Sequence, residues 1–239
     1  MTSEGDFYTI KEFTLNPVPH PPSAESTLAL VKDIIATIPD GWKFTKGGAN
    51  FETKVYYKYI GPELWYARTT IHDGSKHPYE WFKRTLYQDL FKNMMGYFDV
   101  IKEYKLSVEQ EQGWQGYNLK YTLPAPFAQR DLATWLLPIM PEEDKDEFYV
   151  VAMPADIPLP EDATTRGVYA FFHRVRKLEN GDVEWTLGTT SDMKGNLPRW
   201  VQNLSVPGLL VSDVQTFVDW MEDNYKPIIV PEGEQTEET

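Results

Sequence analysis

The side chains best suited to acid–base or metal chemistry are few in this chain of 239 residues. Its four histidines are His20, His72, His77 and His173. His72 and His77 stand five positions apart in the charged stretch HDGSKH, a spacing that matches neither a helical metal pair nor a zinc motif. Cysteine is absent from the sequence, which excludes thiol nucleophiles, iron–sulfur clusters and thiolate zinc sites. We therefore predict no metal site and no cofactor.

Motifs that mark catalytic or phosphate-binding loops are also missing from the sequence. There is no GxSxG nucleophile elbow, no Walker A loop and no GxGxxG dinucleotide loop. The acidic run over residues 142–147 lacks the Asx–Gly spacing of a calcium loop, and we interpret it as a solvated turn. The groups left for acid–base work in an apolar interior are Tyr117, Tyr121, Tyr169 and His173. We predict that the chain is not an enzyme, and we assign no catalytic residue.

Hydrophobic periodicity predicts the elements that must position these side chains. Apolar residues recur at helical spacing over 28–38 and 78–95, and again from residue 197. Alternation of apolar and polar residues indicates strands near 51–59, 64–72, 100–111, 117–123, 132–137, 148–153, 167–178 and 183–190. Short turns such as Asn180-Gly181 cannot join parallel strands, so we expect an antiparallel sheet and an α+β fold class.

The two ends of the chain differ from its middle in composition. Residues 16–22, Asn-Pro-Val-Pro-His-Pro-Pro, cannot form a helix or an inner strand because proline lacks an N–H. We expect residues 1–25 to form an extended arm, residues 26–230 a single ligand-binding domain, and residues 231–239 a disordered acidic tail. The first residues are not those of a signal peptide, and no apolar stretch is long enough to span a bilayer. We predict a cytoplasmic monomer.

Charge and composition restrict the partners. The chain has 23 Lys and Arg against 36 Asp and Glu, a net charge of −13. This charge repels nucleic acids and anionic membranes, so we exclude nucleic acid as a partner. The sequence is 41% hydrophobic and 14% aromatic, with eight Trp, and it therefore has bulky rings for a core or a pocket.

A curved antiparallel sheet needs something to cover its concave face, and a C-terminal helix with an apolar stripe is available. The space between such a helix and a sheet can be a packed core or a tunnel, and the pattern leaves both open. A tunnel lined in this way would hold an apolar molecule, because polar ligands need convergent donors. Alternation puts Lys120 on the opposite face, and the inward lining that we predict is Tyr117, Leu119, Tyr121, Met153, Tyr169, Phe171, Trp185, Leu187, Leu210, Val214 and Phe217. Both faces of 168–176 are apolar, so the pattern leaves the orientation of Tyr169 and Phe171 open.

Residues 192–200, Asp-Met-Lys-Gly-Asn-Leu-Pro-Arg-Trp, resemble the segment that joins the last strand to the final helix in START lipid-transfer domains. Arg130-Asp131 and Arg166-Gly167 agree with two further motifs of that family in order and spacing. The resemblance covers residues 26–225 in element order. The chain as a whole is similar to fungal START-like proteins of uncharacterised function. The resemblance implies a helix-grip fold, in which a curved antiparallel sheet wraps around a long C-terminal helix and encloses an internal hydrophobic cavity.

The motif residues have structural interpretations beside the family one. We expect Arg130 and Asp131 to form an ion pair or to bond backbone, Arg166 to brace the loop before it, and Gly195 to supply a turn with positive φ. Asp192 and Pro198 are the remaining motif residues that we expect to be structural. Pro198 fits the start of the final helix, where proline is tolerated. Family members that hold sterols or phospholipids often have a buried Arg six residues beyond that of Arg-Asp. That position is Leu136 here, so Leu136 joins the predicted lining and a more apolar ligand is favoured.

A departure at Val206-Pro207-Gly208 suggests where a ligand enters. Proline removes a helical hydrogen bond, so we predict a short helix over 197–204 and a longer one over 208–224. By family analogy the loop 154–165 faces this junction. The gate residues that we predict are Ile157, Leu159, Pro207 and Gly208, with Ile157 and Leu159 able to touch a membrane transiently.

Three functions compete on these grounds. The leading hypothesis is a protein that binds and carries a hydrophobic small molecule, such as a lipid, sterol, isoprenoid or apolar metabolite, without chemistry. The alternative is an enzyme that resembles polyketide cyclases and aromatases and acts in the same cavity. The third is an interaction module whose interior is filled by its own side chains.

Overall fold

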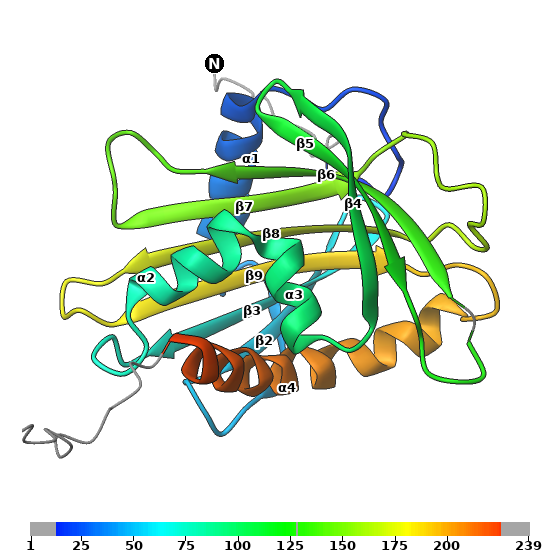
Figure 1. Ribbon diagram of the computed structural model, residues 1–239. Coiled ribbons are helices and arrows are strands. Elements are labelled where there is room, and N and C mark those ends of the chain that lie inside the picture. The colour runs from blue at the N-terminus through cyan, green and yellow to red at the C-terminus, as the bar shows by residue number, and fades with distance from the viewer. Residues whose placement is uncertain (1–12, 128, 226–239) are drawn as a thin grey trace, which may run out of the picture.

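The computed structural model describes residues 13–127 and 129–225, and its body is a single nine-stranded antiparallel sheet (Figure 1). The strand order is β1-β2-β3-β9-β8-β7-β6-β5-β4. The strands are β1 (Lys43–Gly47), β2 (Lys54–Ile60), β3 (Glu63–His72), β4 (Ile101–Glu111), β5 (Trp114–Tyr121), β6 (Arg130–Ile139), β7 (Glu147–Pro154), β8 (Val168–Lys177) and β9 (Val183–Asp192). The predicted α+β class and antiparallel sheet are confirmed. Strand β1 was not predicted because all five of its residues are exposed and show no alternation.

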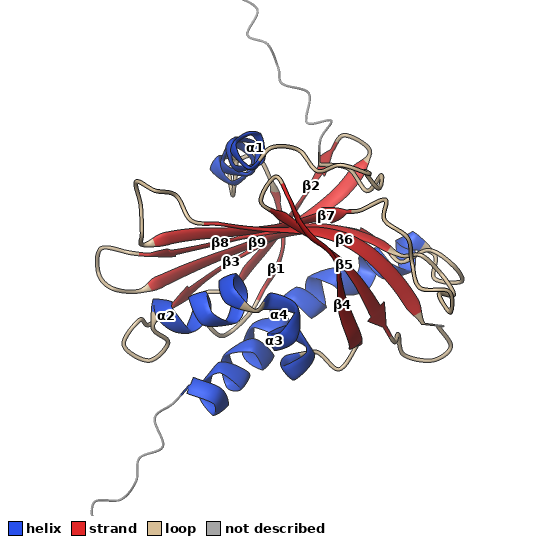
Figure 2. Ribbon diagram, turned by 45° about the horizontal axis from the view of Figure 1, so that its top comes forward, coloured by secondary structure: helices blue, strands red, loops and turns tan. Residues whose placement is uncertain are grey.

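Helices cover both faces of this sheet (Figure 2). Helix α1 (Ala24–Ala36) lies on one face. The other face holds α2 (Tyr79–Phe82), the π-helix η1 (Lys83–Gln88), α3 (Leu90–Tyr97) and α4 (Arg199–Tyr225). The sheet curves around α4, so this second face is the concave one, and the predicted helix-grip fold is confirmed. None of the helices in the described ranges has the length and apolar character needed to cross a membrane.

The described part of the predicted N-terminal arm is integral to the fold. Phe13 and Leu15 are buried against the convex face, and the Val18 carbonyl accepts hydrogen bonds from Asp156 N at 2.8 Å and Trp135 Nε1 at 3.0 Å. Helix α1 starts inside the range predicted for the arm because Ser23 caps it, accepting from Ser26 N at 3.2 Å. Residues 1–12 and the predicted tail at 231–239 lie outside the described residues.

Helix α4 is continuous, which corrects the predicted break at Pro207. Proline at this position has no N–H to donate to the carbonyl of Asn203, four residues earlier. The Tyr66 hydroxyl of β3 donates to that carbonyl instead, at 3.0 Å. A residue far away in the sequence thus satisfies the acceptor that proline leaves free, and the helix runs through Gly208 without interruption.

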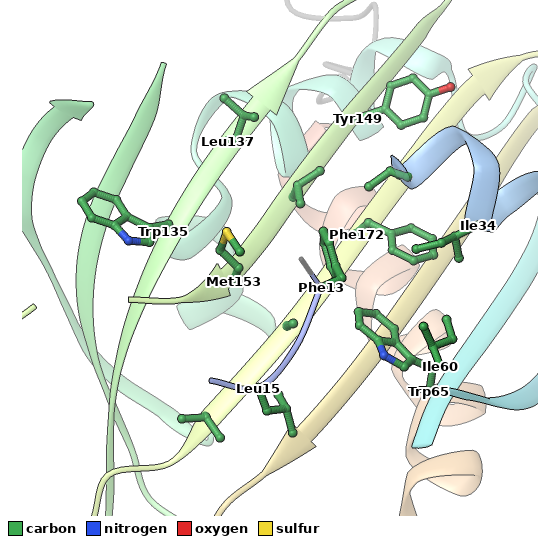
Figure 3. Packing of buried hydrophobic residues seen from close by; sticks show 14 of the residues in the cluster. Phe13, Leu15, Ile34, Ile60, Trp65, Trp135, Leu137, Tyr149, Met153 and Phe172 are labelled. Atoms are coloured by element: carbon green, nitrogen blue, oxygen red, sulfur yellow. The ribbon is translucent and has the colours of Figure 1, made fainter. Parts of the chain in front are cut away.

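The sheet separates two apolar clusters that we call the convex core and the concave core. Figure 3 shows convex-core residues Phe13, Leu15, Ile34, Ile60, Trp65, Trp135, Leu137, Tyr149, Met153 and Phe172. The concave core contains Tyr79, Phe82, Leu86, Leu90, Phe91, Leu119, Leu132, Leu136, Phe148, Val150, Ala152, Tyr169, Phe171, Val175, Val183, Trp185, Phe217, Val218 and Met221. Because both faces are covered, every residue of β7 is buried. The central strands therefore show runs of apolar residues rather than alternation.

Candidate ligand-binding interior

Most of the residues predicted to line the interior lie on the concave side. Leu119, Leu136, Tyr169, Phe171, Trp185 and Phe217 belong to the concave core, and Tyr117, Tyr121 and Leu187 pack against it. Val214 is buried, and Leu210 packs with Val55 and Tyr66 in a small cluster that Leu187 also joins. Lys120, predicted to face away, pairs with Asp162 at 2.8 Å, so the register predicted for β5 is correct.

Met153 is the exception and lies in the convex core (Figure 3). It stands opposite Trp135 in the β6–β7 pairing, and both side chains point to the convex side. Its neighbour Ala152 occupies the concave side. The prediction for Met153 is wrong because β7 is apolar on both faces, so its alternation carries no information on orientation.

Aromatic rings form a nearly continuous row across the concave core. Tyr169 and Phe171 stack with ring centres 5.4 Å apart, and Phe171 leads on to His173 at 5.1 Å. His173 lies 5.8 Å from Trp185, which contacts Phe217 of α4 at 4.4 Å. The rings of sheet and helix therefore touch across the interior, and side chains close the space where the sequence predicted an internal cavity.

A small hollow of about 60 Å³ lies where the helices meet the edge of the concave core. It is lined by the junction of η1 and α3 at Asp89 and by strands β4, β5 and β6. Two residues predicted for the lining, Tyr117 and Leu136, reach it. The hollow marks a place where the packing between the helical cover and the sheet is incomplete.

A larger hollow of about 610 Å³ lies on the convex side, between α1 and strands β2, β3 and β7–β9. Four of its charged side chains pair with one another. Arg174 reaches Glu147 at 2.5 Å and Glu184 at 3.4 Å, and Arg176 reaches Glu184 at 2.9 Å. We assign no ligand to this hollow, because its paired charges leave little to recognise one.

Burial moves the pKa values of the four acid–base candidates named from the sequence away from neutrality. It lowers the pKa of His173 to about 3, an effect that the positive charge of Arg68 reinforces. His173 Nδ1 accepts from Trp185 Nε1 at 3.0 Å, so this ring is a neutral acceptor. Burial also raises the pKa of Tyr117, Tyr121 and Tyr169. None of these four groups is tuned for proton transfer near pH 7.

Arg68 is a residue of this interior that the sequence analysis missed. It stands in the middle of β3 with 1% of its surface exposed, and it pairs across the sheet with Val55 and Leu187. Burial lowers the pKa of its guanidinium to about 10, so the group stays charged at neutral pH. The available signal was a charged residue directly after the run Leu-Trp-Tyr-Ala at 64–67 of a predicted strand.

The predicted motif residues meet at one end of the sheet, where Arg130 organises the turn before α4. Its guanidinium donates to the Met193 carbonyl at 2.6 Å, the Lys194 carbonyl at 3.2 Å and Asn196 Oδ1 at 3.1 Å. Asp192 accepts from Lys194 N at 2.9 Å, and Gly195 has a φ of +63°. Pro198 follows this turn, and its carbonyl accepts from the N–H groups of the first turn of α4. Of the two roles expected for Arg130, the structure therefore shows bonds to backbone rather than an ion pair with Asp131.

Asp131 and Arg166 hold the loop at 154–165. Asp131 Oδ2 accepts from Thr164 N at 2.9 Å, and Arg166 donates to the Ala155 carbonyl. The first contact ties the end of the loop to β6, and the second joins the two ends of the loop to each other. They agree with the structural roles expected for the two residues.

The gate predicted between this loop and Pro207-Gly208 has no counterpart in the structure. Ile157 is buried in the convex core and Leu159 packs against it, so neither is placed to touch a membrane. The Pro207 region lies against β2 and β3 on the other side of the sheet, where Val206 packs with Val55 and Tyr66. The family analogy placed the loop opposite the helix, whereas the N-terminal arm holds it on the convex side.

Comparisons with known proteins agree with this fold. Human STARD10 superimposes with a TM-score of 0.70 at 14% identity, over 88% of this chain and 87% of that one. Human StAR-related lipid transfer protein 5 gives 0.68 at 15% identity, over 85% and 98%. A fragment of a STAR-related lipid transfer protein from Xanthomonas axonopodis gives 0.61 at 15%, over 77% and 99%. At such identities the likeness shows the fold alone.

Sequence comparison supplies the family. No curated protein matches the chain. A family model described as "Protein of unknown function (DUF3074)" matches residues 65–221, from β3 to the last turns of α4. The matched range includes strands β4–β9 and most of β3, the helices that cover their concave side and the motif residues at the end of the sheet. The chain belongs to the DUF3074 family, and its fold is the helix-grip fold of START domains.

Proposed function

We propose that this protein binds a hydrophobic small molecule between the concave face of its sheet and helices α2–α4, and carries it without chemical change. The observation that supports this is the composition of the concave core. Apolar and aromatic side chains from the sheet and from four helical segments face one another there, in a fold shared with solved structures whose names include lipid transfer. Burying about 400 Å² of apolar ligand surface would contribute on the order of 10 kcal/mol before ordering costs.

Binding requires the interior to open, because aromatic rings fill it in this structure. The hollow at the η1–α3 junction is a place where the packing of the cover is incomplete. A π-helical turn followed by a residue outside helical geometry, Asp89 at φ −136° and ψ 49°, interrupts the helical hydrogen bonds at this point. We propose that α3 moves away from β5 and β6 here to admit the ligand.

The cyclase alternative gains no support from the site. Burial moves the pKa of His173 down and the pKa values of Tyr117, Tyr121 and Tyr169 up, so the four residues nominated for this chemistry are poor general acids or bases near neutral pH. We therefore propose binding rather than catalysis.

Native mass spectrometry of freshly purified protein, with extraction of the bound lipids, tests the proposal. We expect an added mass that disappears on extraction and returns with a hydrophobic molecule. Leu136 and Leu137 provide matched variants, because they are neighbours on β6 and face opposite cores. Leu136→Ala should change the amount or identity of the bound molecule, whereas Leu137→Ala should lower stability and leave the bound molecule unchanged. Protein that neither retains nor takes up any hydrophobic molecule would contradict the proposal.

A further inference from the structure

Arg68 is a buried cation whose hydrogen-bonding capacity is largely unused. Its Nη1 donates to the Leu210 carbonyl at 3.2 Å, and its guanidinium carbon lies 3.9 Å from the centre of the Trp185 ring. Nε and Nη2 are buried and have no hydrogen-bond partner in the part of the chain that the structure describes. Such groups are uncommon in folded proteins, since an unpaired buried donor loses its bonds to water and gains nothing in return.

The two unpartnered atoms share one edge of the guanidinium. Nε–H and Nη2–H point the same way from the planar group, and their spacing matches the two oxygens of a carboxylate. A hydroxyl or carbonyl oxygen fits this fork less well, because a single acceptor does not meet both donors along their axes. A carboxylate also neutralises the positive charge, which an alcohol or an ester does not.

Within residues 13–127 and 129–225 no carboxylate bonds these two nitrogen atoms. Asp213 of α4 is the acidic residue whose charge acts on Arg68, and it forms no ion pair or hydrogen bond with Arg68 among the described residues. Burial raises the pKa of Asp213 to about 6, so this carboxyl is itself poorly solvated. The residues beside Arg68 across the sheet, Val55 and Leu187, are apolar.

We infer that Arg68 anchors the ligand of the concave interior and that this ligand is a hydrophobic carboxylic acid, whose carboxylate accepts from Nε and Nη2 while its hydrocarbon part lies among the concave-core side chains. The inference rests on the proposed function and names the chemical class of the molecule bound. Because both nitrogen atoms are buried, the side chains over them must move when the acid enters.

A matched set of probes tests the inference on the full chain, freed of bound lipid, at about pH 7.5. The probes are hexadecanoic acid, hexadecan-1-ol and methyl hexadecanoate, with the corresponding ten-carbon compounds as a second set. Binding is followed by the fluorescence of the tryptophans, among which Trp185 lies against Arg68. We expect the acid to bind at least tenfold more tightly than the alcohol or the ester of the same chain length.

Variants of Arg68 separate the contribution of its two parallel donors from the contribution of its positive charge. Arg68→Lys keeps the charge and loses the fork, and Arg68→Gln loses both, so each should abolish most of the preference for the acid. Arg176→Gln removes the same charge from the convex side and should leave the preference intact. Asp213→Asn removes a negative charge near the anchor and should strengthen binding of the acid. If Asp213→Asn instead weakened binding of the alcohol, the ligand would be a hydrogen-bond donor and the inference would be wrong.

The outcomes distinguish this inference from the function on which it rests. If no probe binds, the proposed function fails. If all three bind equally to the unmodified protein, or the alcohol binds best, the hydrophobic site stands and the carboxylate anchor is overturned. The comparison of acid, alcohol and ester on the unmodified protein decides the matter even if the Arg68 variants fail to fold.

Discussion

Gly195 shows how one residue type is required by its position. Its φ of +63° lies in the left-handed region, and a Cβ there would approach Arg130 Nη2 and Thr165 Cγ2 at 3.1 Å each. The turn that precedes α4 therefore depends on glycine for two reasons, backbone conformation and the close approach of Arg130.

We expect Gly195→Ala to lower the stability by about 2 kcal/mol, measured by chemical or thermal unfolding. Gly61→Ala is the matched control, because Gly61 has a φ of +59° and nothing within 4 Å of its would-be Cβ. Gly61→Ala should lower the stability only by the cost of the left-handed backbone conformation, about 1 kcal/mol. Equal losses in the two variants would show that the contact with Arg130 contributes nothing.

At the scale of elements, α4 owes its continuity to a strand. The Tyr66 hydroxyl donates to the Asn203 carbonyl that Pro207 leaves without its helical partner. Tyr66→Phe should therefore lower the free energy of unfolding by about 1 kcal/mol. In a Pro207→Ala background the same change should cost less, since the introduced alanine supplies an N–H to the Asn203 carbonyl. A double-mutant cycle in denaturant measures the coupling, and strict additivity would contradict this account.

The first half of α4 also presents an uncharged surface. Residues 200–212 contain no charged side chain, and Trp200 and Leu204 are 68% and 75% exposed. An uncharged apolar stripe can meet a bilayer without the repulsion that a net charge of −13 would otherwise cause.

We expect Trp200→Ser with Leu204→Ser to reduce binding to phosphatidylcholine vesicles at least about tenfold, because each side chain contributes roughly 1.5 kcal/mol or more when buried. Leu209→Ser is the matched control, since Leu209 is also exposed but projects from the helix about 180° away from Trp200. Co-sedimentation with vesicles measures the effect. An equal loss in Leu209→Ser would show that the stripe is not the contact.

At the scale of the whole molecule, buried ionisable groups should set the response to acid. Burial, with neighbouring positive charge, lowers the pKa of His72 and of His173 from 6.5 to about 3. Their contribution to stability is complete above about pH 6.5 and is lost as the pH falls, because the unfolded chain takes up protons first. Asp213 acts in the opposite sense, since burial raises its pKa from 3.8 to about 6 and its contribution is lost as the pH rises.

Between about pH 6 and 4 the effect of the two histidines on stability is larger than the opposite effect of Asp213. The three groups together should therefore lower the free energy of unfolding by about 1.4 kcal/mol for each unit by which the pH falls. His173→Gln keeps an acceptor for the Trp185 indole and removes one of the two histidines. We expect the slope of stability against pH in this variant to be shallower than the parent's by about that amount. Unfolding in denaturant at a series of pH values measures it, and parallel slopes would contradict the assignment of His173 as a buried neutral group.

The parts of this molecule that sequence predicts are those governed by local rules. The turn at Gly195, the hairpin at Asn180-Gly181 and the concave orientation of Leu119 follow from conformation or alternation, which neighbouring residues report. Met153 and Arg68 lie in stretches of strand where consecutive residues are buried, so alternation does not show which face their side chains occupy. The predicted helix break at Pro207 is wrong for a different reason. The hydrogen bond that compensates for the proline comes from Tyr66, a partner that the local sequence does not reveal.

The two cores on opposite sides of one sheet have a consequence for the divergence of such proteins. The convex core, with Trp65, Trp135 and Phe172 under α1 and the arm, packs one face of the strands with side chains that are separate from those facing α4. Residues of the concave side are thus free to vary with the molecule they accept, while the opposite side preserves foldability. Selection for cargo and selection for stability act on separate sets of residues, so a lineage can exchange one ligand for another without passing through unstable intermediates.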